Sequence, residues 1–203
     1  MMRVLLWLNS NAPSRKLISQ LADDVDIVAG VDGGYDRALE CGFVPDMVIG
    51  DLDSVQSSCE GIQRVSFPDQ ESSDLVKAIT YLTEAGYDEF EIVGIEGGLE
   101  SHQLGVWGAL VDAPEGVGIR LHTDRSEIIR INPNSPPFRV GVPIGSVFSV
   151  FALQDCQAVT VEGGKWNLKE EDLKLSTKGL HNVAVAEFLS FSSDGVAVAI
   201  INR

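Results

Sequence analysis

The chain has 203 residues, of which 44% are hydrophobic, and its formal net charge is −15. This length allows one large domain or two small ones. Such an acidic chain lacks the basic surface that nucleic acids and anionic membranes attract, so we expect neither as a partner. A nucleotide is not excluded, because a metal ion can lie between carboxylates and phosphates.

The first segments alternate between buried strands and amphipathic helices. Apolar runs predict strands, and segments with apolar residues at helical spacing predict helices. The strands are expected at residues 4–8, 26–31, 45–50 and 89–95, and the helices at 12–22, 35–42, 72–86 and 101–111. Alternating strands and helices predict a doubly wound, mostly parallel sheet with helices on both faces.

The pattern changes after about residue 122. A segment rich in proline, asparagine and glycine, residues 131–141, resembles a linker or turn region. Short strands are expected at residues 146–153, 158–163, 181–191 and 196–202, the last two joined as a hairpin at Asp194-Gly195. We therefore predict an α/β domain over residues 1–122 and an antiparallel β-sandwich domain over 123–203.

The cysteines and the N-terminus indicate a compartment. The three cysteines lack CxxC spacing, so neither a disulfide framework nor a zinc site is expected. The opening apolar run is too short for a signal peptide and predicts a first strand instead. No segment approaches the ~20 apolar residues of a membrane span. Together these features favour a cytoplasmic protein in a reducing environment.

The segment GDLDS contains the clearest candidate site. Ligands of parallel α/β sheets bind beyond the carboxyl ends of strands, and Asp51 and Asp53 follow the strand that ends at Gly50. In an extended segment both carboxylates would share one face, where Mg²⁺ would offset their repulsion. The alternative is an exposed acidic turn capped by Ser54.

Three further turns carry polar groups. Asp32 precedes Gly33-Gly34, and His102 follows Gly97-Gly98. These glycines would let the backbone approach a phosphate, or would form plain tight turns. His102 would be a base or phosphate donor, or a histidine bonded to backbone.

The last of these turns, PDQESSD, leads into the most clearly predicted helix, at residues 72–86. Glu71 and Asp74 lie in its first turn, where acids complement the helix dipole without any ligand. The same position would keep both carboxylates ionised for a metal ion. Both interpretations remain open from the residues alone.

In order along the chain, these motifs resemble those of the thiamine pyrophosphokinase family. The stretch from Val31 to Val55 is similar to the family's DGG…PD…GD-x-DS block, and PDQESSD is similar to its PDQD-x-TD segment. GGKWNL, residues 163–168, is similar to its GLKWNL segment.

The resemblance implies a function and a set of site residues. The family transfers pyrophosphate from ATP to the thiamine hydroxyl with Mg²⁺, releasing AMP, as a homodimer with a shared active site. It implies catalytic Asp51, Asp53, Asp74 and Glu71, with Asp51, Asp53 and Asp74 as metal ligands. It implies a nucleotide site at Asp32, Gly33, Gly34, Ser54, Gly97, Gly98 and His102, and a substrate site at Gln70, His181 and Asn182.

The chain departs from the family pattern at Glu71 and Ser73, where the family has aspartate and threonine, and at three further positions. The family's arginine and aspartate in the following block are replaced by Leu99 and Ser101, and the serine before Asn182 is replaced by His181. A leucine cannot make the bidentate phosphate contact of an arginine. Two alternatives therefore stay open: a pyrophosphokinase for another hydroxymethyl heterocycle, and an inactive binder of a nucleotide or thiamine.

Overall fold

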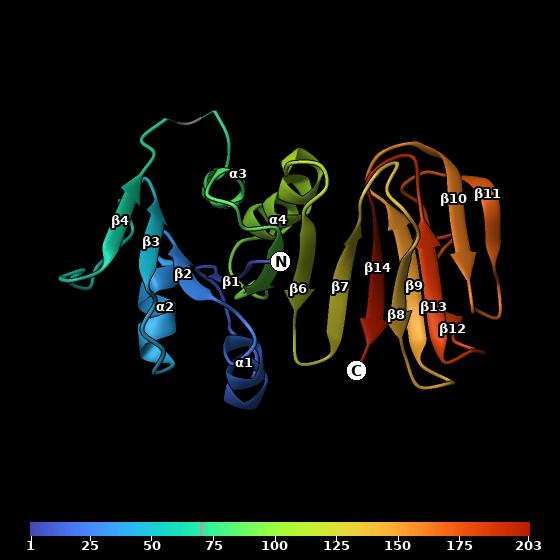
Figure 1. Ribbon diagram of the computed structural model, residues 1–203, viewed down its shortest axis with the longest axis horizontal. Coiled ribbons are helices and arrows are strands. Elements are labelled where there is room, and N and C mark those ends of the chain that lie inside the picture. Colours follow the sequence, from blue (N-terminus) through green and yellow to red (C-terminus); the bar gives the residue numbers. More distant parts are fainter. Residues whose placement is uncertain (70) are drawn as a thin grey trace. The chain divides into compact units, whose positions relative to one another are not determined.

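The computed structural model describes residues 1–69 and 71–203. The chain forms two compact units, Met1–Asp124 and Arg125–Arg203, drawn from blue to green and from yellow to red in Figure 1.

The first unit is built on a parallel sheet. Its strands are β1 Arg3–Trp7, β2 Ile27–Val31, β3 Met47–Gly50, β4 Gln63–Ser66, β5 Glu89–Val93 and β6 Gly118–His122, in the order β6-β5-β1-β2-β3-β4. Each neighbouring pair is parallel. The chain leaves β1 toward β2 on one side and later returns to add β5 on the other. The strand order therefore reverses between β1 and β5, where α/β sheets bind their ligands.

Helices cover both faces of this sheet. They are α1 Arg15–Ala22, α2 Gly34–Glu40, α3 Asp74–Glu84 and α4 Glu100–Asp112. Leu5 and Trp7 of β1 pack with Ile18 of α1 and Ala38 of α2. The α3 helix contacts β2, β3 and α4 instead. In Figure 1, α1 and α2 are drawn in the lower part of the first unit, and α3 and α4 in its upper part. The predicted doubly wound parallel sheet is confirmed.

The second unit is a sandwich of two antiparallel sheets. One has the order β12-β9-β14-β7 and the other β11-β10-β13-β8. Their bounds are β7 Ser126–Ile131, β8 Phe138–Gly141, β9 Val147–Ala152, β10 Cys156–Glu162, β11 Leu168–Leu173, β12 Asn182–Val183, β13 Phe188–Ser192 and β14 Ala197–Asn202. Phe148 and Phe191, one from each sheet, meet in the core in edge-to-face geometry, with their ring centroids 5.9 Å apart. The predicted antiparallel sandwich is confirmed.

Three sequence-based expectations about this unit are wrong. Residues 181–191 form two strands, β12 and β13, which belong to different sheets. The predicted hairpin at Asp194-Gly195 is absent, because β14 pairs with β7 and β9 while β13 pairs with β8 and β10. The expected linker at residues 131–141 contains β8. Alternation marks a strand but does not determine its partner, which depends on contacts distant in sequence.

Asp194 stabilises the connection between the two sheets. Its carboxylate accepts hydrogen bonds from the backbone N–H of Gln157, at 2.9 and 3.1 Å, and of Ala158, at 3.1 Å. These backbone donors, first that of Ala158, lower the pKa of Asp194. Because the folded pKa is below the unfolded value, this stabilisation is complete above pH ~4 and is lost as pH falls through the folded pKa.

We expect Asp194→Asn to lower the free energy of unfolding by about 1 kcal/mol at pH 7, since the charge strengthens these bonds. The difference from wild type should shrink as pH falls through the folded pKa of Asp194 and vanish once that aspartate is protonated. Urea unfolding at several pH values measures it. Asp172→Asn, on an exposed residue of β11, is the control. A pH-independent difference would contradict the assignment.

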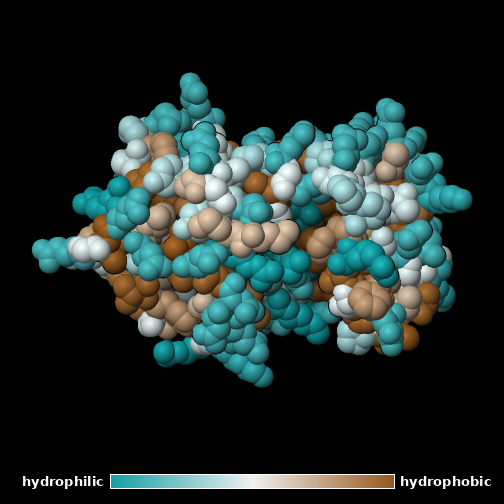
Figure 2. Space-filling view, viewed as in Figure 1, coloured by the Kyte–Doolittle hydropathy of each residue, from teal (hydrophilic) through white to brown (hydrophobic). Residues whose placement is uncertain are grey.

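The surface hydropathy and the cysteines do not by themselves indicate a binding site. Polar and apolar residues are interspersed over the visible face of each unit, so hydropathy by itself does not mark a binding face (Figure 2). No helix among the described residues has both the length and the apolar character needed to cross a membrane. Cys41, Cys59 and Cys156 are free thiols.

Candidate active site

A cavity of about 390 Å³ opens in the first unit at the carboxyl ends of its strands. Its walls include Leu8 to Ser10 after β1, Val31 and Asp32 at the end of β2, and Gly94 and Ile95 after β5. The start of α3 and the first turns of α4 complete it. The cavity therefore lies where the strand order reverses, as expected for a ligand site of this architecture.

Three carboxylates converge at this cavity. Asp32, Asp51 and Asp74 each place one oxygen within 4.8 Å of the others, and each side chain is partly buried. They come from the ends of β2 and β3 and from the first residue of α3. Oxygen donors grouped in this way are the ligands that hard divalent cations prefer. The donor set fits a Mg²⁺ ion.

The charge in the cluster supports this fit. Burial, followed by the negative charge of Asp51, raises the pKa of Asp74, and Lys77 only partly opposes this effect.

The first unit carries all of the net charge: 22 acidic and 7 basic residues give −15, whereas the second unit has 8 of each, giving 0. A bound cation would relieve the repulsion between the three carboxylates.

Asp51 and Asp53 do not lie in an extended segment, so the expectation of a shared face is wrong. Leu52 between them has a φ of 66°, in the left-handed region, which turns the chain. The Asp53 N–H donates to Asp51 at 3.2 Å, and the Asp53 carboxylate accepts from the Ser54 hydroxyl at 2.9 Å. Among the described residues, Asp32 rather than Asp53 completes the cluster. The roles implied for Asp53 stay predictions.

Lys77 is a residue of this site that the sequence reasoning missed. Its side chain lines the cavity, and only 8% of the residue is exposed. Its ammonium lies 3.5 Å from Asp74 and donates to the main-chain oxygens of Phe67, at 3.3 Å, and Asp69. In sequence, a lysine three positions after an aspartate resembles an exposed helical ion pair. Only its burial in the structure distinguishes Lys77 from such a surface ion pair.

The first pair of glycines has a packing explanation. A β-carbon on Gly34 would lie 1.8 Å from the main-chain oxygen of Trp7, and one on Gly33 would lie 2.4 Å from the Asn9 side chain. Gly34 therefore lets α2 begin directly against the end of β1. The phosphate contacts expected for both glycines remain predictions.

The second pair forms a turn before α4. Gly97 and Gly98 have φ values of 80° and 75°, which suit glycine. The oxygen of Gly97 accepts from Gln103 at 3.1 Å, while His102 and Ser101 line the cavity. The Leu99 side chain, where the family has arginine, is 61% exposed.

The remaining predicted residues of this unit are Ser54, Glu71 and Gln70. Ser54 lines the cavity, and its N–H donates to Asp32 at 3.4 Å. Glu71 is exposed, and its N–H donates to Asp69 at 3.3 Å. Gln70 lies outside the described residues.

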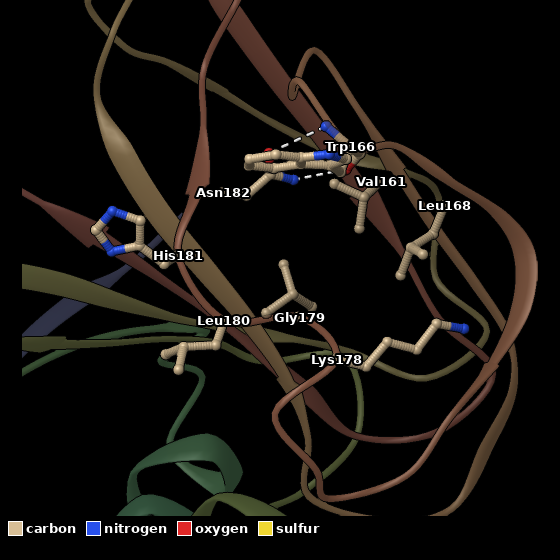
Figure 3. A pocket seen from close by; sticks show the side chains of 9 residues that line it. Val161, Trp166, Leu168, Lys178, Gly179, Leu180, His181 and Asn182 are labelled. Atoms are coloured by element: carbon tan, nitrogen blue, oxygen red, sulfur yellow. Dashed lines mark hydrogen bonds between the residues drawn. The ribbon is translucent and has the colours of Figure 1, made fainter.

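The second unit contains a separate pocket of about 230 Å³, lined by Trp166, His181 and Asn182 among others (Figure 3). In Figure 3, Val161 and Leu168 face the hollow, Trp166 lies above it, and the ring of His181 lies at its outer edge. Trp166 is 57% exposed. The Lys165 ammonium lies 4.7 Å from the centroid of its ring, as a cation over an aromatic face does.

Asn182 holds the backbone of Trp166. Its amide nitrogen donates to the Trp166 oxygen at 2.6 Å. Its oxygen accepts from the N–H groups of Trp166, at 3.1 Å, and Val183, at 2.8 Å. Since Asn182 is buried, these bonds fix the backbone from which the indole of Trp166 projects. Asn182 is a predicted site residue, whereas Trp166 is not, although Trp166 lies in the family-like segment GGKWNL.

We expect Asn182→Ala to lower the free energy of unfolding by about 2 kcal/mol, because it leaves backbone groups of Trp166 without partners. Trp166 fluorescence should also shift, since the indole loses its anchor. Thermal unfolding and emission spectra measure both effects. Asn202→Ala, at an exposed position of β14, is the matched control. A variant as stable as this control would contradict the anchoring role.

The fold and this site define a protein with an α/β unit, a β-sandwich unit and a cluster of carboxylates beside a cavity at the switch point of a parallel sheet. The model of the thiamin pyrophosphokinase catalytic domain matches residues 18–121, just over half of the 203-residue chain. The chain therefore belongs to the thiamin pyrophosphokinase family. No curated protein sequence matches it significantly.

Solved structures share the whole fold at low sequence identity. A thiamine pyrophosphokinase from Bacillus subtilis is 21% identical with a TM-score of 0.77, covering 100% of this chain and 98% of its own. A Lactobacillus plantarum protein is 22% identical with a TM-score of 0.78, covering 100% and 98%. A thiamin pyrophosphokinase from Candida albicans is 15% identical with a TM-score of 0.77, covering 98% and 89%.

Proposed function

We propose that the protein transfers pyrophosphate from ATP to the hydroxyl of thiamine in a Mg²⁺-dependent reaction, giving thiamine diphosphate and AMP. The observation that carries the proposal is the convergence of Asp32, Asp51 and Asp74 within 4.8 Å of one another, beside the cavity that Asp32 and Asp74 line. Family membership supplies the substrates. Phosphoryl-type transfer depends mainly on positioning and charge neutralisation, which such a cluster serves.

The bonds that change are few. The thiamine hydroxyl oxygen attacks the β-phosphorus of ATP, and the bond from that phosphorus to the oxygen bridging the α-phosphate breaks. AMP leaves with the bonding electrons, and a carboxylate takes the hydroxyl proton. Asp74 is the better candidate for this base, because it lines the cavity whereas Glu71 is exposed outside it. A bound Mg²⁺, held by Asp32, Asp51 and Asp74, would neutralise phosphate charge.

The second pocket supports thiamine as the acceptor. Aliphatic side chains and an indole face that already attracts the Lys165 ammonium suit a cationic aromatic heterocycle such as the thiazolium of thiamine. We propose that Asn182 and Trp166 contact the acceptor there, that Gln70 contributes as the resemblance implies, and that the protein acts in the cytoplasm.

One assay tests the reaction. Purified protein is incubated with ATP, Mg²⁺ and thiamine, and AMP and thiamine diphosphate are quantified together. We expect both products in equal amounts. AMP formation only with another hydroxymethyl heterocycle would transfer the proposal to that acceptor. Calorimetric binding of ATP or thiamine without turnover would indicate an inactive binder and overturn the catalytic proposal.

We also propose a homodimer whose active sites combine residues of both copies. Light scattering tests the dimer, and mixing Asp51→Asn with Asn182→Ala tests the shared site. Each variant alone carries a defect in every site. A mixed dimer would have one site with neither defect, so subunit exchange should restore up to about a quarter of wild-type activity. Absence of any recovery after exchange would contradict the shared site.

A further inference from the structure

Lys77 occupies an unusual position for a basic residue. Among the described residues, no other lysine or arginine lines the cavity of the first unit. It lies one turn into α3, three residues after Asp74, and only 8% of it is exposed. A buried ammonium is costly unless its hydrogen-bond donors have partners, so its contacts indicate its role.

The partners of Lys77 account for its donors. An ammonium has three N–H groups. It contacts the main-chain oxygen of Phe67 at 3.3 Å, the main-chain oxygen of Asp69, and Oδ1 of Asp74 at 3.5 Å. The Asp69 carboxylate lies farther away, at 3.9 Å. With three acceptors around three hydrogens, the ammonium has no donor left for a phosphate oxygen.

These contacts join two segments. Phe67–Asp69 follows β4, while Asp74 begins α3, whose N-terminus Ser73 caps by accepting from the Val76 N–H at 3.4 Å. Because Lys77, in the interior of α3, bonds to both Phe67–Asp69 and Asp74, it restricts the movement of these two segments relative to each other. It also orients the Asp74 carboxylate, one of whose oxygens belongs to the carboxylate cluster.

We propose that Lys77 is a positioning residue: it ties Phe67–Asp69 to the first turn of α3 and so holds Asp74 in the cluster with Asp32 and Asp51. Its effect on turnover rests on the proposed function, but its effect on local order does not. Lys77 thus differs from the family's missing arginine, which Leu99 replaces, because it acts through a carboxylate and not on phosphate.

Two variants and one control test this role. Lys77→Met removes the donors, whereas Lys77→Arg keeps the charge but places its donors in a planar fork that cannot reproduce the three contacts. Lys16→Met removes the same charge from an exposed position of α1. Hydrogen exchange of the wild type and variants, followed in peptides covering residues 65–69 and 71–76, requires no substrate.

We expect exchange in these peptides to be at least about tenfold faster in Lys77→Met than in Lys16→Met, with the rest of the first unit unchanged. In the thiamine assay, kcat should fall about tenfold or more in both Lys77 variants while KM for ATP changes less than about threefold. If Lys77→Met does not fold, Lys77→Arg decides both measurements.

Three outcomes would overturn the proposal. They are unchanged local exchange, a wild-type kcat in Lys77→Arg, and a defect confined to KM for ATP, which would make Lys77 a phosphate ligand. If the wild type lacks turnover, the proposed function fails, and the exchange measurement still decides whether Lys77 joins the two segments.

Discussion

Replacing Asp51 with asparagine should lower kcat by about a thousandfold or more, equivalent to ~4 kcal/mol of transition-state stabilisation. Asparagine has nearly the same size, so the fold is retained, but the carboxylate cluster loses one of its three charges. The remaining amide oxygen is a weaker ligand for a divalent cation. Asp51 follows β3 directly, so its position is set by the sheet and cannot be taken by a neighbour.

Calorimetry with Mn²⁺ as a substitute for Mg²⁺ gives a readout independent of turnover. Asp51→Asn should bind Mn²⁺ at least about tenfold more weakly than wild type, since affinity depends on the number of charged ligands. Asp24→Asn, at an exposed position after α1, controls for the change in net charge. Wild-type Mn²⁺ affinity in Asp51→Asn would show that the cluster does not hold the ion.

Asp53→Asn separates the resemblance from the geometry. The resemblance implies a metal and catalytic role for Asp53, whereas the structure places Asp32 with Asp51 and Asp74. Comparing the Mn²⁺ affinities of the Asp32→Asn and Asp53→Asn variants therefore shows which of the two carboxylates contributes more to binding the ion.

Replacing Gly34 with alanine should destabilise the first unit by about 3–4 kcal/mol, toward the upper end for overpacking. The new methyl carbon would lie 1.8 Å from the main-chain oxygen of Trp7 and 2.7 Å from its carbonyl carbon. These are backbone atoms of a central strand, so relief requires α2 to move away from β1. Asp32 lies two residues before the start of this helix, so the cluster should be displaced as well.

Denaturant unfolding, followed by circular dichroism, measures the loss. Gly108→Ala is the control, because a β-carbon there meets nothing within 4 Å and the residue lies in α4. Alanine is the better helix former, so this control should be stabilised by about 0.5–1 kcal/mol. A Gly34→Ala protein as stable as wild type would contradict the close approach of α2 to Trp7.

The sequence by itself determined the alternation of strands and helices in the first unit and the location of its acids, but not its strands β4 and β6. Continuous apolar runs alternating with helical periodicity predicted the parallel sheet, and the acids after Gly50 and at Asp74 indicated its carboxyl edge. These features are local, because a strand or helix reflects the side chains within its own window. The family motifs are likewise local, which is why they survive at low identity.

Only the tertiary structure decided which groups meet. The cluster contains Asp32, which follows a different strand from Asp51, and does not contain Asp53. Leu52, between Asp51 and Asp53, takes a left-handed conformation that a local pattern does not predict. Lys77 is a buried contact and not a surface ion pair because Phe67 and Asp69 return over it from β4. In the second unit, the turn at Asp194 leads from one sheet to the other, since strand partners are selected by packing across the core and not by the sequence of the turn.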